Sequence, residues 1–154
     1  MIRSILRGCV AGAAGTTVLN AVTYADMAAR GRPSSSTPQD AVEKITERAG
    51  HPLPDTDGRD NRLTGLGALS GLAVGTGTGV AVSLLHRAGF RPPVVLGGVV
   101  TGLLAMAAND LPMTRLGITD PRTWSAQDWA SDVVPHLLFG LATYAAVAAS
   151  ARET

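Results

Sequence analysis

Long stretches without a charged residue alternate with charged segments along the chain. Four of them cover residues 8–25, 63–85, 94–108 and 133–151. Because the hydrocarbon core of a membrane is about 30 Å thick, a helix crosses it with roughly 20 apolar residues. The pattern predicts an all-α membrane protein, a single membrane domain over residues 1–154 with four transmembrane helices. The predicted spans are residues 5–29, 63–86, 92–111 and 132–151, each to within a few positions.

Two other interpretations of the apolar stretches are open. The first is a soluble bundle of unusually apolar helices, but in residues 63–85 the only polar side chains are hydroxyls, so no face of that helix suits water. The second is a cleaved signal over residues 1–29, because Arg3 and Arg7 precede an apolar run. That run is long for a signal, and Asp26 stands where small neutral residues are expected.

The segment 30–62 holds 12 of the 25 charged residues, which indicates a solvated connection between the first two spans. Within it, Thr37 has the place of a helix cap, Pro38 the first helical position and Asp40 that of a capping-box acid. They predict a short amphipathic helix over about 38–49. This helix would lie either on the membrane surface or against a neighbouring helix.

A second short helix is predicted over about 124–131, just before the last span. Thr123 or Ser125 is placed to cap it. Trp124 and Trp129 are expected to anchor it at the membrane–water interface, where tryptophan is favoured.

Glycine is abundant, at 18 residues, while aromatic residues make up only 4% of the chain. In lipid, helices associate by close packing, which small residues four positions apart allow. We therefore expect Gly-xxx-Gly seams, with the span 63–86 as the central helix; an interface with another subunit is the alternative. The glycines concerned are Gly67, Gly71, Gly75, Gly79, Gly98, Gly102, Gly8 and Gly12.

Ionisable residues at membrane depth are costly and are therefore candidates for function. Asp128, Asp132 and His136 are spaced four apart and share one face if the helix runs unbroken into the last span. Pro135 instead favours a span that begins just before it, with Asp132 as the cap. Acids at a helix start, proton or metal handling, and substrate contact are the three interpretations of this group.

The first and third spans add further polar candidates. Asp110 follows Asn109 at the end of the third span, and Asp26 has Arg30 one turn later, as in an ion pair near the interface. We rank Asp110, Asp132 and His136 first, because the spans that carry them are joined directly. The full set of polar candidates is Asp110, Asp132, His136, Asp128, Asn109, Asp26 and Asn20.

Charge and motif content exclude several function classes. The formal net charge is +1 and Cys9 is the only cysteine, so neither nucleic-acid binding nor a multi-cysteine zinc site is expected. The run Gly75–Gly79 lacks the lysine of a phosphate-binding loop and the spacing of a dinucleotide fold. We expect no cofactor and no metal, and an enzyme is unsupported. Four spans place both chain ends on one side of the membrane, with the side undecided.

Two groups of residues carry a resemblance to a known kind of protein. They are the stretch GTTVLNAVTY at 15–24 with Gly31, Arg32 and Pro33, and Trp129 followed by Asp132, Pro135, His136 and Gly140. In these residues the chain resembles small uncharacterised four-helix integral membrane proteins of high-GC, actinobacterial-type bacteria. The resemblance implies a multi-pass protein of the bacterial inner membrane and implies no mechanism.

Abundant packing surface and sparse chemistry favour a structural or accessory subunit of a larger membrane assembly. Its partners would be the lipid bilayer and either other membrane subunits or a second copy of the chain. The alternative is a small transporter or proton-coupled carrier that uses the intramembrane Asp and His residues.

Overall fold

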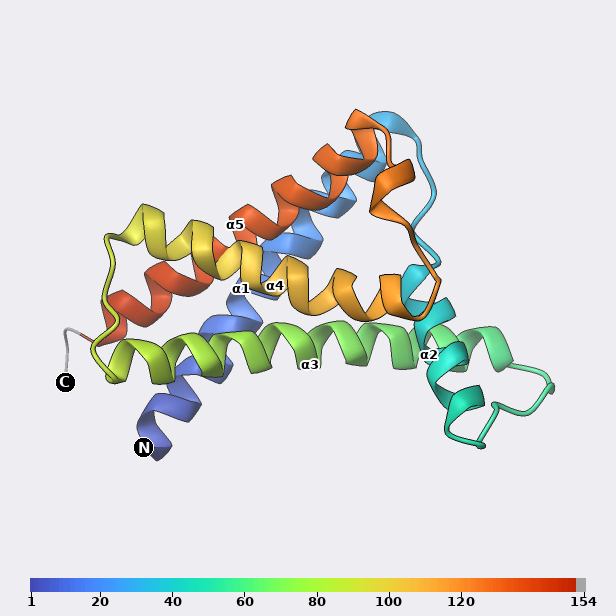
Figure 1. Cartoon of the computed structure of the whole chain (residues 1–154), viewed down its shortest axis with the longest axis horizontal. Coiled ribbons are helices and arrows are strands. Elements are labelled where there is room, and N and C mark those ends of the chain that lie inside the picture. Colours follow the sequence, from blue (N-terminus) through green and yellow to red (C-terminus); the bar gives the residue numbers. More distant parts are fainter. Residues whose placement is uncertain (152–154) are drawn as a thin grey trace.

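The computed structural model describes residues 1–151, which form five α-helices and no strand (Figure 1). Four of the helices are long and apolar enough to cross a membrane, as in a multi-pass membrane protein. The predicted all-α architecture, including the short helix in the first connection, is confirmed. The helices are α1 (Ile2–Arg30), α2 (Thr37–Arg48), α3 (Arg59–Arg87), α4 (Val94–Arg115) and α5 (Ala126–Ser150), with a 3₁₀ turn, η1 (Pro121–Thr123).

The long helices pack in the spatial order α3, α1, α5, α4. Helix α1 packs extensively against both α3 and α5, and α5 packs equally against α4, whereas α3 touches α4 and α5 only slightly. The expectation that the span 63–86 is the central helix is therefore wrong. Helices α1 and α5 are central: Gly8 and Gly12 bring α1 close to α3, Gly15 brings it close to α5, and Gly140 brings α5 close to α4.

Two of the helix pairs approach until their backbones touch. A Cβ on Gly79 of α3 would meet backbone atoms of Gly8 and Gly12 in α1, and one on Gly140 of α5 would meet the backbone of Gly102 in α4. No side chain larger than hydrogen fits at these positions. Close contact of this kind is how apolar helices gain dispersion energy where lipid supplies no hydrophobic drive.

The four-glycine row of α3 does not face a single neighbour. Gly75 lies against the hydroxyl of Thr16 in α1, while Gly67 lies against Pro38 of α2. No heavy atom from another part of the described chain lies within 4 Å of a Cβ placed on Gly71. Only part of the row contacts α1, and its use as an association motif in a bilayer stays a prediction.

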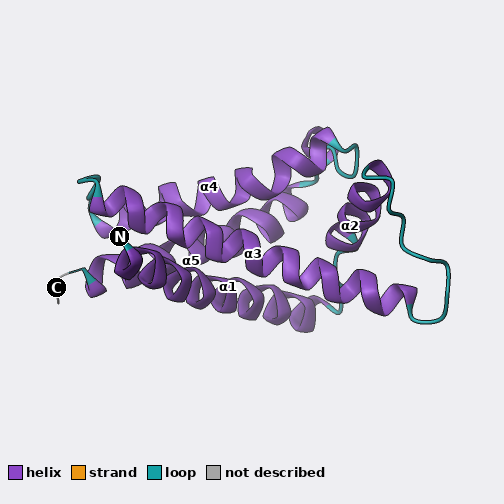
Figure 2. Ribbon diagram, turned by 90° about the horizontal axis from the view of Figure 1, so that it is seen from below, coloured by secondary structure: helices purple, strands orange, loops and turns teal. Residues whose placement is uncertain are grey.

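The two ends of the bundle differ in content. The N-terminus, the turn between α3 and α4 and the end of α5 lie together, and α2 with the other connections lies at the opposite end (Figure 2). We call these the terminal end and the loop end. The N-terminus and the end of α5 are thus on one side of the bundle, and Arg152 lies outside the described residues.

Helix α5 departs from the expected boundaries. The predicted helix 124–131 and the predicted span 132–151 form one continuous helix that begins at Ala126. Ser125 caps it, and Trp124 precedes it. Pro135 is too far inside the helix to be its first residue, so the helix tolerates the loss of one backbone hydrogen bond there.

A polar pocket at the loop end

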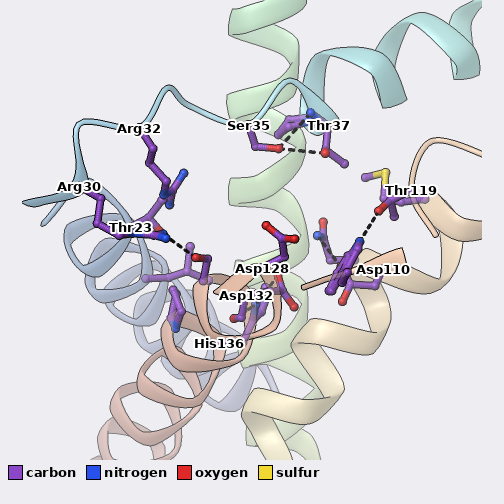
Figure 3. Close-up of a pocket in the computed structure, with 17 residues that line it drawn as sticks. Thr23, Arg30, Arg32, Ser35, Thr37, Asp110, Thr119, Asp128, Asp132 and His136 are labelled. Carbon is purple, nitrogen blue, oxygen red and sulfur yellow. Dashed lines mark hydrogen bonds and ion pairs between the residues drawn. The ribbon is translucent and has the colours of Figure 1, made fainter. Parts of the chain in front are cut away.

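A pocket of about 440 Å³ lies at the loop end between α1, α4 and α5 (Figure 3). Leu19 and Thr23 line it from α1, and Met113 lines it from α4. Residues 32–38, which link α1 to α2 and begin α2, lie over its mouth. The size is within the range of roughly 300–1,000 Å³ typical of small-molecule sites.

Asp110, Asp132 and His136, the three candidates ranked first, all line this pocket. The Nδ1 atom of His136 lies 2.9 Å from the carbonyl oxygen of Asp132 and 3.3 Å from its Oδ1 atom. The two side chains are only 12% and 21% exposed. Asp110, which lies on α4, lines the same cavity as these two α5 residues. The direct connection between the third and fourth spans thus brings these groups together.

Two carboxyl oxygens in this group lack a partner. The Oδ2 atoms of Asp110 and Asp132 are buried and accept no hydrogen bond from residues 1–151. Asn109 donates only to the other oxygen of Asp110, over 3.3 Å. An ionised carboxylate can only accept, so two facing carboxylates need a proton or a cationic donor between or beside them.

The α1 side of the pocket is held by a charged triad. Asp26 accepts from Arg30 Nε at 2.6 Å and from Arg32 Nε at 2.6 Å, and Arg30 also donates to Ser131 Oγ of α5 at 2.6 Å. The sequence predicts the Asp26–Arg30 pair. Arg32 and Ser131 were missed, and only the spacing of Arg32 just after α1 could have indicated its part.

Asp128 has a structural partner at the start of α5. Its Oδ2 atom accepts from the Ser125 backbone N–H at 2.9 Å, and the Ser125 hydroxyl accepts in turn from the Asp128 N–H at 3.2 Å. This is a capping box, which satisfies otherwise orphaned donors. Asp128 also lines the pocket, and the capping box supports the first of the three interpretations, an acid at a helix start.

The rings of Trp124 and Trp129 contact each other edge to face, and Trp124 lines the pocket. The two rings lie 5.0 Å apart at 64°. Trp124 lines the cavity and donates from Nε1 to Thr119 Oγ1 over 2.9 Å, whereas Trp129 is partly exposed. Trp124 therefore offers an aromatic wall whose polar atom is already satisfied.

Outside the spans, Asp120 precedes η1 and pairs with Arg122. The Arg122 Nε atom lies 2.9 Å from Asp120 Oδ1, and this guanidinium holds the pKa of the Asp120 carboxyl below its usual value. Asn20, another candidate, is exposed on α1 and does not line the pocket. Within residues 1–151, no three His, Cys, Asp or Glu side chains are placed to hold one metal ion.

No protein-family model, curated protein or solved structure matches this chain.

Proposed function

We propose that this chain is a small multi-pass membrane protein that binds a small polar solute in the loop-end pocket, as a carrier does. One observation carries the proposal. Asp110, Asp132 and His136 come from two different helices, are chosen from the sequence as costly in a membrane, and line the same cavity. Among the two functions considered from the sequence, this favours the transporter over the accessory subunit.

The position of the pocket supports this function. It lies between helices at the end that carries the long connections, so a solute can enter from the water-facing loops. Its floor has two carboxyl groups beside an imidazole, and histidine exchanges protons near neutral pH more readily than other side chains. A solute site next to such a group is what coupling of solute movement to protons requires.

A binding panel tests the proposal. The purified protein is unfolded thermally in detergent with amines, carboxylates, polyols and amino acids in turn, because a ligand that binds only the folded state raises the midpoint. We expect at least one class to raise it in the wild type and not in Asp132→Asn. Asp120→Asn is the matched control, since that aspartate lies outside the pocket. No stabilising class, or stabilisation that survives Asp132→Asn, would contradict a solute site here.

The accessory-subunit function has its own supporting observation. Leu66, Leu69 and Leu72 of α3 are exposed, and Gly71 beside them has no neighbour in the described chain. Lipid or another helix would cover this face. Size-exclusion chromatography with light scattering after mild extraction separates the two, because a subunit gives a mass above that of the 15.7 kDa chain.

The location forms part of the same proposal. We place the protein in the inner membrane of a bacterium, with the lipid bilayer as its surroundings, on the resemblance described for residues 15–24 and the start of α5. Fractionation of cells that express the tagged chain tests this location, and recovery in the outer membrane or the soluble fraction would contradict it.

A further inference from the structure

The charged groups around the pocket are not balanced. Asp110, Asp128 and Asp132 line it together with Arg30 and Arg32. Both guanidinium groups are already bound by Asp26, which does not itself line the cavity. Four carboxyl groups thus stand against two guanidiniums and the imidazole of His136, which lies beside Asp132, and the acids on the α4–α5 side have no arginine of their own.

Three hydrogen-bond donors on the α4–α5 side, from Asn109, Trp124 and Ser131, already have acceptors. The Asn109 amide donates to Asp110, the Trp124 indole donates to Thr119, and Ser131 Oγ donates to the Gln127 carbonyl over 2.8 Å. The Oδ2 atoms of Asp110 and Asp132 nevertheless lack a donor. The pocket therefore has unused acceptors on Asp110 and Asp132, which suits a ligand that brings N–H groups.

Part of the remaining wall is apolar or aromatic and suits the carbon atoms of a ligand. Leu19, Met113 and Trp124 line the cavity beside the acids. An aromatic face also attracts a cation, more strongly where water is excluded. A cavity of about 440 Å³ holds a small organic molecule, well beyond the size of a bare ion.

From this arrangement we propose that the ligand is a small organic cation, a primary amine. Its ammonium group binds the carboxyl groups of Asp110 and Asp132, and its carbon chain lies against Trp124 and Met113. The inference rests on the proposed solute site and names the chemical class that the site takes. An anionic ligand is disfavoured because the two arginines that would bind it are held by Asp26.

The chain carries its own reporter for this ligand. Trp124 and Trp129 are its only tryptophans, and Trp124 lines the pocket. Intrinsic fluorescence of the purified protein is titrated with 4-amino-1-butanol, 1,4-butanediol and 4-hydroxybutyrate, which are matched in length and differ in charge. We expect a saturable change in fluorescence with 4-amino-1-butanol and none with the other two probes. We expect Asp132→Asn and Asp110→Asn to weaken its binding about tenfold or more, because each removes one side of a charge-assisted contact.

The possible outcomes distinguish a failure of the amine inference from a failure of the proposed solute site. If the diol or the anion binds as tightly as the amine, and Asp132→Asn weakens it, the site stands and the amine assignment is overturned. If the amine binds equally to wild type and to both aspartate variants, it binds elsewhere and the inference fails. If none of the three saturates, the inference fails, and the thermal panel then decides whether another solute class keeps the proposed function.

Folding of the variants is checked independently. Each must elute as wild type and unfold cooperatively, and Asp120→Asn must bind the amine as wild type does. Should one aspartate variant fail to fold, the other carries the variant test. The comparison of the three matched probes uses only the wild-type protein.

Discussion

Helices α1 and α5 run through both the terminal end and the loop end of the bundle. They pack into an apolar cluster at the terminal end and line a polar cavity at the loop end. At the terminal end, Ala11, Val82, Tyr144 and Val147 form a buried cluster of α1, α3 and α5. At the loop end, α1, α4 and α5 enclose a polar cavity. The comparison shows that tight helix packing and cavity space occupy different parts of the same helices along their length.

Even the histidines differ between the two ends. His86 at the terminal end is 8% exposed and lies edge to face with the Tyr144 ring, at 6.0 Å. The Tyr144 hydroxyl donates to the carbonyl of Pro92 over 2.9 Å, which ties α5 to the turn before α4. His136 instead lies beside a carboxyl group and lines a cavity. Burial against an aromatic ring makes the first histidine structural, and the acid beside the second makes it a candidate for chemistry.

The largest expected effect tests the tight packing. Gly140→Ala places a Cβ inside the backbone of α4, so we expect a loss of about 2 kcal/mol in the free energy of unfolding. Gly71→Ala is the matched control, because its Cβ meets nothing and alanine favours a helix by roughly 1 kcal/mol over glycine. Denaturant titration of both variants measures the difference. Equal effects would mean that the close approach of α4 and α5 does not matter for stability.

A smaller effect is expected from the tie between α5 and the turn. Tyr144→Phe removes the hydroxyl that bonds Pro92 and keeps the ring against His86. We expect a loss of about 1 kcal/mol in the free energy of unfolding, the usual worth of one such hydrogen bond. Amine binding at the far end should not change, and a change there would show that the two ends are coupled.

Removing the charged triad tests the loop end alone. Asp26→Ala frees Arg30 and Arg32 to face the pocket, so we expect amine binding to weaken several-fold and binding of 4-hydroxybutyrate to appear. Tryptophan fluorescence measures both. The effect should shrink as salt is raised, because these side chains are partly exposed. If the anion still does not bind, the arginines do not decide the charge preference of the pocket.

The smallest effect concerns an ion pair at the loop end that does not line the pocket. Arg122 lowers the pKa of Asp120, so the pair contributes stability above the usual carboxyl pKa and loses it as pH falls through the lowered value. Both side chains are well exposed, which keeps the effect small. We expect the unfolding temperature of Asp120→Asn to differ slightly from wild type at neutral pH and to converge with it in acid. A large difference would contradict this picture of an exposed pair.

Much of the fold follows from local pattern, whereas the partners of individual residues do not. The charge-free stretches predict the four long helices, and the direct joining of the third and fourth spans predicts that Asp110 and Asp132 meet. The contact of Arg30 with Ser131 joins residues 101 positions apart, which no local spacing reveals. The row at Gly67 to Gly79 predicts a packing face, but which helix it meets depends on how α2 and α1 cross α3.

One register of α5 serves both the contact with α4 and the pocket. Asp132, His136 and Gly140 follow one another at intervals of four, and on α4 Gly102 and Asp110 lie two such intervals apart. One inserted residue between His136 and Gly140 would rotate everything before it by about 100° around the helix axis. Length changes in this turn are therefore far more damaging than substitutions. The spacing of residues along α5 therefore links the contact with α4 to the geometry of the pocket.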